Sequence, residues 1–570
     1  MGAKAVKKRV HFILTLVVLI LCVGLFLWRE HQATGTFGFP LDDAWIHAQF
    51  ARNLALGQGF SYNPGEPVSG STAPLWTLVN ATGFLIAGDP VLTPKILGIL
   101  FLWLSVFFVY ALVRAMTGDE RQALFAAVAT AALPRLVWAS VSGMEITLAV
   151  TLSLAGIVAH LLYTAPRDPR QYLSTVLFGL AALARPECGV FFVAAMADRV
   201  LAAVFVRWRE VAARDWLAPV AIHLLVFGCI LLPFMVFSRR FGIGVLPNTA
   251  YAKALLWNTG LIAGVATDNA GEIVRSFTVR PYDYALSFLR ESLDANPVLF
   301  VLGAFGLAQL LFSIPYREGS RCRSFIVPLS IVLFPLVVGV VVPFGGASYQ
   351  MGRYAAPMAP LMLVIGTIGM YAAAHHAAGL LSEAKYLGRP ATIVLERALL
   401  WILMAFALIA QARGVWYQAR CFGMQVDNIQ DMQVSMAKWI DQNVPEDAVV
   451  AANDVGAIAY FSQRRVVDTV GLISPGVLGH MRPGVSRDDA VMAFLEEERP
   501  DYAVLFPNWY PDLVSRARLF ERAHSVVLEE NLICGGPELV AYRLRWEGWP
   551  DRNEKVAPPA GASRRPEGAP

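Results

Sequence analysis

Long apolar runs separated by short polar segments dominate the first three quarters of the chain. After an apolar run at the N-terminus, further runs of spanning or near-spanning length lie near residues 74–88, 91–113, 122–141, 146–164, 172–184, 187–206, 216–237, 297–315, 324–343, 355–376 and 397–412. A helix needs about 20 apolar residues to cross a hydrocarbon core of roughly 30 Å, so these runs predict transmembrane helices. Because spanning segments must satisfy their backbone internally, the pattern predicts a helical bundle.

The distribution of basic loops predicts how the chain crosses the membrane. The run at 74–88 is short and ends at "DP", so we expect it to lie at the outer interface rather than to cross. The short basic loops then all fall on the side of the N-terminal Lys4, Lys7, Lys8 and Arg9, as the positive-inside rule requires. This predicts about eleven crossings, an uncleaved N-terminal anchor, and an outer location for loops 29–90 and 238–296 and for the C-terminal region.

The C-terminal part of the chain has a different pattern. From about residue 414, short β-like runs such as "AVVAAN" and "YAVLF" alternate with helical stretches such as "MQVSMAKWIDQN". We therefore expect a transmembrane domain over 1–413 and a small α/β domain over 414–547 outside the cytoplasm. The Pro-, Gly- and charge-rich segment 548–570 predicts a disordered tail.

The composition excludes several classes of protein. The chain of 570 residues is 56% hydrophobic and only 16% charged, which a soluble domain rarely is. Its net charge of +4 is small, and no basic block with interleaved aromatics indicates nucleic acid. The six cysteines form no C-x-x-C motif; Cys421 and Cys534 lie in the polar C-terminal region, where a disulfide is compatible with the sequence.

Two adjacent acids, Asp42 and Asp43, open the amphipathic stretch "AWIHAQFARNLALG" in the first outer loop. One interpretation makes Asp43 the N-cap of a helix and Gly57 its C-cap. Capping needs only one acid, however, and leaves Asp42 unexplained. The alternative is that the pair carries chemistry. His47, one turn further on, is interpreted as a surface or packing residue.

Charged side chains also stand at the outer ends of apolar runs. Glu145 lies in "SGMEIT", and Arg185 and Glu187 flank the proline of "ARPE". Charges this close to apolar helix ends are costly unless paired, so they are candidate functional residues. Two structural interpretations remain open: a salt bridge between Arg185 and Glu187 in a helix corner, or a pairing of Glu145 with Arg185.

Two further polar segments complete the candidate site. "LPNTAYAK" and "GGASYQMGRYAAP" contribute Asn248, Thr249, Lys253, Tyr349, Arg353 and Tyr354. Arg353 and Lys253 suit an anionic phosphate, and a carboxylate suits removal of a proton from an acceptor hydroxyl. We expect desolvation near the membrane surface to raise the pKa of such an acid and make it a better base.

The ordered set of these motifs resembles the GT-C superfamily of integral-membrane glycosyltransferases. The segments "DDAWIHAQFARNLALGQGFSYNPGEPVSGSTAPLWT", "SGMEIT", "ARPE", "LPNTAYAK", "GRYAAPMAP" and "NDVGAIAYFSQRRVVDTVGLISP" are similar to a bacterial family within it. That family includes the mycobacterial enzyme that adds terminal arabinofuranose to cell-wall arabinan. The resemblance covers nearly the whole chain.

The resemblance implies an inverting transfer from a polyprenyl-phosphate sugar to a glycan, lipid or protein acceptor outside the bacterial cytoplasmic (inner) membrane. In GT-C enzymes a first-loop Asp acts as general base; the following "ARNL" favours Asp43, and the superfamily's paired acidic motif favours Asp42. Glu145 would position the acceptor or complete a metal site. Some members use a divalent cation and others do not, so the metal requirement stays unknown. The C-terminal domain would bind acceptor glycan, with Trp509 and Tyr510 as stacking candidates.

A different function class remains open. A transporter or flippase for lipid-linked sugars would share the apolar helices and the external domain. Transporters, however, carry polar or broken helices at the bilayer midplane, whereas these runs are apolar through their middles. A ligase for preassembled glycans would share the fold and differ in donor size. The pattern favours the glycosyltransferase.

Overall fold

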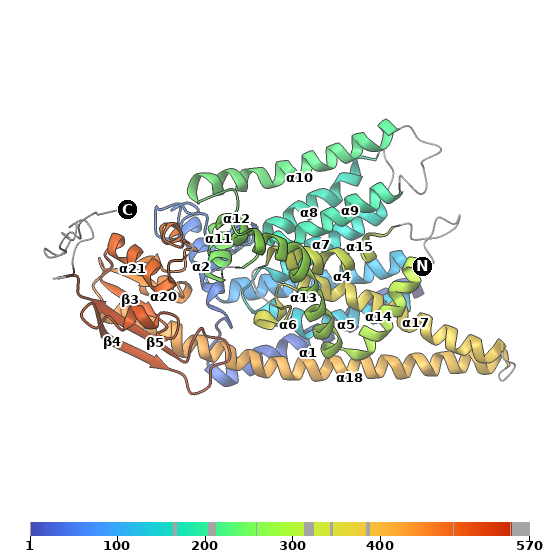
Figure 1. Ribbon diagram of the computed structural model, residues 1–570. Helices are drawn as coiled ribbons and strands as arrows, with labels where there is room; N and C mark the ends of the chain where they lie inside the picture. Colours follow the sequence, from blue (N-terminus) through green and yellow to red (C-terminus); the bar gives the residue numbers. More distant parts are fainter. Residues whose placement is uncertain are drawn as a thin grey trace, which may run out of the picture.

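The computed structural model describes residues 2–163, 168–202, 213–257, 259–312, 324–342, 346–383, 388–482, 484–547 and 549. Apart from residue 549, the predicted tail at 548–570 lies outside the described residues, as does Cys322. Figure 1 shows two parts: a helical part and a smaller α/β part near the C-terminus, drawn in orange and red.

Most helices of the first part run side by side (Figure 1). They are α1 (Gly2–Thr34), α2 (Asp42–Ala55), α3 (Pro74–Ala87), α4 (Leu92–Thr117), α5 (Glu120–Ala131), α6 (Pro134–Val141), α7 (Ile146–Leu162), α8 (Leu173–Ala184), α9 (Gly189–Ala202), α10 (Ala213–Phe241), α11 (Asn248–Trp257), α12 (Leu261–Ala266), α13 (Ala270–Ala295), α14 (Pro297–Phe312), α15 (Ile326–Val341), α16 (Tyr349–Gly352), α17 (Ala359–Glu383) and α18 (Arg389–Ile429).

Length and composition make the chain a multi-pass membrane protein. In the described part, five segments are long and apolar enough to cross a membrane: Arg9–Thr34, Leu92–Thr117, Ala218–Phe241, Tyr349–Glu383 and Arg389–Asn443. A sixth results if α5 and α6, bent by 51°, form one span. Shorter apolar helices include α3, α7 and α15. The count of eleven crossings stays a prediction.

The bend between α5 and α6 differs from the single continuous crossing predicted at 122–141. Pro134 is the first residue of α6, and Leu133 before it has an extended backbone. Proline lacks the amide hydrogen that would continue the helix and disfavours helical geometry in the preceding residue. The apolar pattern alone did not reveal this break.

The helix α18 connects the two parts without a loop. It is 41 residues long and continues through a π-helical turn at Gln430–Val434 into α19 (Ser435–Asn443). α1 packs along it, with the rings of Phe26 and Phe422 5.6 Å apart. The predicted boundary at 413/414 lies within α18, and the domain limits stay a prediction.

The C-terminal part is a mixed sheet with helices, which confirms the prediction of an α/β region. Its strands β1 (Val449–Ala452), β2 (Arg465–Asp468), β3 (Tyr502–Leu505), β4 (Phe520–Val527) and β5 (Glu538–Leu544) have the order β2-β1-β3-β5-β4. β1 runs parallel to β2 and β3, whereas β5 is antiparallel to β3 and β4. The helices are α20 (Gly456–Ser462), α21 (Arg487–Glu498) and α22 (Pro511–Val514).

The hydrophobic core of the α/β region includes side chains from the helical part. Ile46 and Phe50 of α2, Tyr62 and Val68 of the following loop, and Ala252 of α11 belong to it. Figure 1 shows α2 and α11 next to the region. The two parts therefore bury apolar surface against each other and are not joined by the chain connection alone.

Two sequence expectations about the C-terminal region are not met. Cys421 and Cys534 are free thiols, so the disulfide that the sequence allowed is absent. Tyr510 is fully buried and its hydroxyl lies 3.2 Å from that of Thr469. Tyr510 is therefore a core residue and cannot stack on a glycan. Trp509 is partly buried and donates to Gly535 O at 2.8 Å.

Candidate active site

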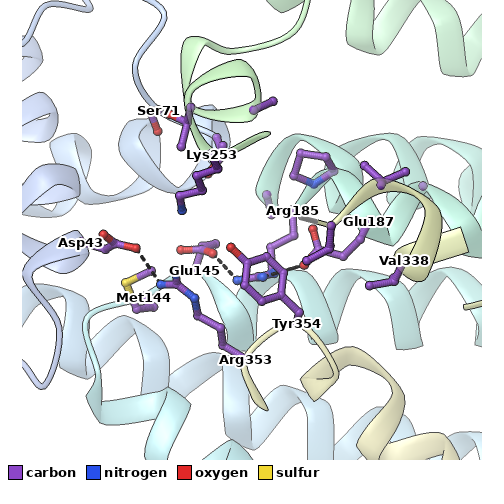
Figure 2. A pocket seen from close by; sticks show the side chains of 18 of the residues that line it. Asp43, Ser71, Met144, Glu145, Arg185, Glu187, Lys253, Val338, Arg353 and Tyr354 are labelled. Carbon is purple, nitrogen blue, oxygen red and sulfur yellow. Dashed lines mark hydrogen bonds and ion pairs between the residues drawn. The ribbon is translucent and has the colours of Figure 1, made fainter. Parts of the chain in front are cut away.

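A cavity of about 330 Å³ lies where the helical part meets the α/β region. Of the eleven site residues predicted from the sequence, eight line it: Asp43, Glu145, Arg185, Glu187, Thr249, Lys253, Arg353 and Tyr354. Figure 2 shows their charged side chains converging from several different segments. Asp42, Asn248 and Tyr349 are not part of its lining. The structure therefore brings most of the predicted residues together, and the functional role of each remains a prediction.

The cavity has two chemically different walls. The charged residues gather at one side, and the other side is apolar, with Val190 and Val193 of α9 and Val337, Val338 and Val341 of α15. An amphipathic cavity of this kind suits a ligand with a charged head and a hydrocarbon chain.

Asp43 lies in the first turn of α2 and faces the cavity. The N-cap is Leu41, with extended backbone and no side-chain cap, so the interpretation of Asp43 as N-cap is wrong. The C-cap is Leu56 rather than the predicted Gly57, which follows it with φ +76° and donates to Leu54 O. Asp43 Oδ2 lies 2.7 Å from Arg353 Nη1, and 32% of the Asp43 side chain is exposed.

The pKa of Asp43 moves opposite to our expectation. Burial raises it, but the positive charges of Arg353 and Lys253 outweigh burial, and the pKa falls well below the usual value of 3.8. The expectation considered desolvation alone, because the sequence did not reveal that the carboxylate pairs with a guanidinium. In this state Asp43 is ionised and a weak base.

Asp42 has a different environment. Its Oδ2 accepts from Gly456 N at 2.7 Å and its Oδ1 accepts from Ala457 N at 2.8 Å, both in the α/β region. Burial and the nearby Asp454 carboxylate raise the pKa of Asp42 to about 8. The pKa alone would favour Asp42 as a base. Its position argues against that role, because each of its oxygens accepts a backbone amide hydrogen and it does not line the cavity.

Glu145, Arg185 and Glu187 form a buried ion-pair chain. Arg185 Nη1 lies 2.5 Å from Glu145 Oε1, and Arg185 Nε donates to Glu187 Oε1 at 2.6 Å. Both structural pairings considered from the sequence therefore exist. The Arg185 guanidinium also lies over the Tyr354 ring, 5.0 Å from its centroid. Pairing offsets the desolvation cost of burying these charges and orients the two carboxylates towards the cavity.

Local sequence explains where two of these residues sit. Arg185 precedes Pro186, which restricts it to the extended backbone it has (φ −149°, ψ 119°) and ends α8. Glu145 follows the tight turn at Gly143, whose φ is +78°. The carbonyl of Gly143 accepts from Trp76 Nε1 at 3.0 Å, so the turn is held by α3.

Two cations face the cavity with donors that have no partner in the described part of the chain. Arg353 is 3% exposed, and its Nε makes no hydrogen bond. Lys253 makes no ion pair or hydrogen bond there, and in Figure 2 its ammonium group points towards the space between Asp43 and Glu145. Unpartnered donors of this kind favour an anionic ligand.

The remaining predicted residues support the walls of the site. Thr249 Oγ1 donates to Gly70 O at 2.6 Å, and Asn248 N donates to Ser69 O at 2.8 Å. These bonds hold the start of α11 against the loop that follows α2. Tyr349 lies outside the lining, with its ring 6.4 Å from that of Tyr354.

A second buried ion pair holds the two segments that carry Asp43 and Glu145. Lys95 Nζ lies 3.0 Å from Glu30 Oε1 and also donates to Val141 O at 2.8 Å. Glu30 Oε1 accepts from Gly38 N at 2.8 Å. The pair therefore joins the segment before α2 to the segment before α7.

His47 is the site residue that the sequence interpretation missed. It lines the cavity, and its Nε2 lies 3.3 Å from Glu145 Oε2. The available signal was its spacing, since residues four apart share one face of a helix and His47 follows Asp43 by four. Leu472 of the α/β region also lines the cavity, and no sequence signal indicated it.

The described residues do not fit a divalent cation. Such an ion is held by several oxygen ligands that converge on one point. In the described ranges no group of three or more His, Cys, Asp or Glu side chains is arranged to hold a metal ion.

Comparison with known proteins supports the fold. Archaeal oligosaccharyltransferase AglB from Archaeoglobus fulgidus, in complex with an inhibitory peptide and a dolichol-phosphate, matches with a TM-score of 0.53 and 14% identity, covering 87% of this chain and 69% of AglB. ArnT from Cupriavidus metallidurans bound to undecaprenyl phosphate matches with a TM-score of 0.53 and 11% identity, covering 92% and 97%. The chain thus has the fold of GT-C membrane glycosyltransferases.

The comparisons do not define a narrower family. Arabinofuranosyltransferase AftD from Mycobacteria matches with a TM-score of 0.43 and 14% identity, covering 92% of this chain and 41% of AftD. Residues 426–551 match a family model described as "Domain of unknown function (DUF8728)". No curated protein matches the sequence.

Proposed function

We propose that the protein is an inverting glycosyltransferase that moves a sugar from a polyprenyl-phosphate donor to an acceptor hydroxyl on the outer face of a bacterial cytoplasmic membrane. The observation that carries this proposal is the cavity itself. Two cations with unpartnered donors stand beside an acid at one side, and valines line the other. The complexes of AglB with dolichol-phosphate and of ArnT with undecaprenyl phosphate support a lipid-phosphate ligand.

The donor's phosphate binds to Lys253 and Arg353. The Arg353 guanidinium presents Nε to the anion while Nη1 holds Asp43. Tyr354 keeps the guanidinium in place, since its ring centroid lies 5.3 Å from Arg353 Cζ. The first isoprene units lie along the valines of α9 and α15.

The transfer needs one proton acceptor. The acceptor hydroxyl oxygen attacks the anomeric carbon, the bond from that carbon to the phosphate oxygen breaks, and the hydroxyl proton passes to Asp43. Polyprenyl phosphate leaves as an anion of low basicity, neutralised by the two cations. Attack opposite the leaving group inverts the anomeric centre.

Phosphate binding also makes Asp43 a better base. In the ligand-free state Arg353 and Lys253 hold the pKa of Asp43 low. An arriving phosphate shares these positive charges, so the desolvation that raises the pKa prevails. Glu145, oriented by Arg185 and His47, is placed to hold the acceptor.

The sequence resemblance supplies the candidate sugar, arabinofuranose, and the candidate acceptor, a cell-envelope glycan. A lipid-linked sugar transporter is the alternative function. In the described structure the cavity that gathers these charged residues is also lined by Leu472 of the α/β region, which favours chemistry at one membrane face.

The deciding experiment identifies the donor that the purified protein consumes. Full-length protein in nanodiscs is incubated with polyprenyl phosphates carrying arabinofuranose, mannose or glucose and with delipidated cell-envelope glycan. Mass spectrometry is expected to detect polyprenyl phosphate released from one donor only when the acceptor is present. Movement of lipid-linked sugar across a vesicle bilayer without release would instead establish the transporter.

The phosphate site is tested separately. Arg353→Gln and Lys253→Met are each expected to raise the donor KM about tenfold or more, because each removes a charge-assisted contact worth about 1.5–3 kcal/mol. The matched control is Lys438→Met, an exposed lysine of the C-terminal region. Unchanged donor KM in both site variants would remove these residues from the phosphate site.

A further inference from the structure

The match to a domain of unknown function leaves the role of the α/β region open. Its position provides an answer. It contributes Leu472 to the cavity wall, and two of its backbone amides donate hydrogen bonds to the carboxylate of Asp42, the neighbour of Asp43. We propose that the α/β region is a structural part of the catalytic centre and that Asp42 is the positioning residue through which it orients Asp43. This inference rests on the proposed function.

The geometry of α2 separates the tasks of its two acids. Successive residues of an α-helix point about 100° apart, so neighbouring side chains face different partners. Asp43 faces the cavity and Arg353, whereas Asp42 faces the first residues of α20. Whatever holds Asp42 therefore determines how the first turn of α2, and with it Asp43, is rotated.

The contact at Asp42 is closely fitted. Each carboxylate oxygen accepts one amide hydrogen, from Gly456 at 2.7 Å and from Ala457 at 2.8 Å. A Cβ atom at Gly456 would collide with the carbonyl oxygen and the carboxylate of Asp42. Only glycine allows this approach, so position 456 ties the α/β region to the acid segment at a defined distance.

Further bonds continue the same junction along α2 and the loop after it. Arg52 Nη1 donates to Tyr460 O at 2.9 Å, and Tyr62 Oη donates to Val455 O at 2.8 Å. Asn63 Nδ2 donates to Val466 O, and Asn63 Oδ1 accepts from Val466 N, both at 3.0 Å. The ring of Trp45 packs against Tyr460 and Phe461. The first outer loop thus has its main partner in the α/β region.

The cavity segment of the α/β region is itself held by a buried acid. Asp468 at the end of β2 accepts the amide hydrogens of Val470 and Ile473, which bracket Leu472. Gly70 of the first outer loop lies directly against Leu472 and Ile473. The region therefore contacts the reaction cavity through Leu472 and the first turn of α2 through Asp42, as a positioning scaffold would.

The test uses four variants of the full-length protein. Asp42→Ala removes both acceptors, Asp42→Asn keeps one acceptor oxygen, and Gly456→Ala pushes the junction apart without changing an acid. Gly479→Ala is the matched control, because nothing lies within 4 Å of a Cβ there. The measurements are kcat, donor KM, acceptor KM, and hydrogen exchange of the first turns of α2 and α20.

Asp42→Ala and Gly456→Ala are expected to lower kcat about 10- to 100-fold, with both KM values within about threefold, because a misplaced base affects the chemical step. Asp42→Asn is expected to stay within about fivefold of the unaltered protein, since one cap bond persists. Hydrogen exchange is expected to quicken in α2 and α20 of the first two variants. Gly479→Ala is expected to change nothing.

Three outcomes would overturn the inference. An inactive Asp42→Asn beside an active Gly456→Ala would make Asp42 the base. An acceptor KM that rises while kcat stays unchanged would make the region an acceptor-binding module. Unchanged exchange in α2 would disprove the mechanical link. Because exchange is measured without substrate, it tests the junction even if no donor is consumed and the proposed function fails.

Discussion

Asp42 and Asp43 are adjacent in the chain, yet their carboxylates have opposite surroundings. Asp43 lies on the cavity side, where Arg353 and Lys253 hold its pKa low. Asp42 lies on the junction side, where burial and Asp454 raise its pKa to about 8. The cavity side is rich in cations, and the partners of Asp42 on the junction side are backbone amides.

The difference shows what each surrounding is suited to do. A carboxylate paired with a guanidinium is stable without ligand and becomes reactive when an anion competes for its partner. A carboxylate that accepts one backbone amide hydrogen on each oxygen and lies outside the cavity lining is suited to hold two segments together. In our proposal the same residue type therefore has a catalytic role on one side of α2 and a structural role on the other.

The largest expected effect separates the two acids directly. Asp43→Asn is expected to lower transfer by about 10²–10⁴-fold, the usual contribution of a general base, whereas Asp42→Asn stays within about fivefold. Polyprenyl phosphate release measured by mass spectrometry gives both values. Glu66→Gln is the control, since Glu66 is a half-exposed acid of the same loop. Equal losses of transfer activity in the two Asp variants would show that Asp42 and Asp43 do not have different roles.

The next effect concerns the buried pair that supports the cavity side. Lys95→Met leaves Glu30 buried without its cation and is expected to lower the free energy of unfolding by about 3–5 kcal/mol. The double variant Glu30→Gln with Lys95→Met is expected to recover most of this loss. Thermal unfolding in detergent compares them. A double variant no more stable than Lys95→Met would show that the charge pair is not the cause.

A third prediction uses pH. Arg353→Gln removes the positive charge that lowers the pKa of Asp43 but keeps the burial that raises it. The acid limb of kcat/KM, which reports the free enzyme, is expected to move to higher pH by about 1–3 units. Profiles between about pH 4 and 8 measure this shift. An unmoved limb would mean that Arg353 does not control the basicity of Asp43.

The smallest effect lies on the junction side. Burial and the charge of Asp43 raise the pKa of Asp454 to about 6. A raised pKa favours the protonated folded state, so this stabilisation is present below the ordinary value of 3.8 and is lost as pH rises through about 6. Asp454→Asn cannot ionise, and relative to the unaltered protein it is expected to gain about 1–3 kcal/mol between pH 4 and 7. Thermal midpoints across this range test the sign; an opposite trend would contradict it.

Much of the architecture follows from the order of apolar and polar residues. The apolar runs after about residue 90 correspond to helices α4–α10, α14, α15, α17 and α18, and the alternation after 414 corresponds to a mixed sheet. Helices form from local periodicity, so their existence is readable from neighbours in the chain. The break at Pro134 follows from local proline chemistry that an apolar pattern does not register, and the continuity of α18 past residue 413 was not foreseen.

The sequence by itself determined which residues are chemically able to act, because charges at apolar helix ends are rare and costly. Eight of the eleven predicted residues line one cavity. Only the tertiary structure decided their partners: Asp43 with Arg353, Asp42 with Gly456 and Ala457, and His47 with Glu145. The first two of these pairings join residues more than 300 positions apart. A pKa depends on charges within a few ångströms, so local sequence could not reveal that two neighbouring acids would have opposite properties.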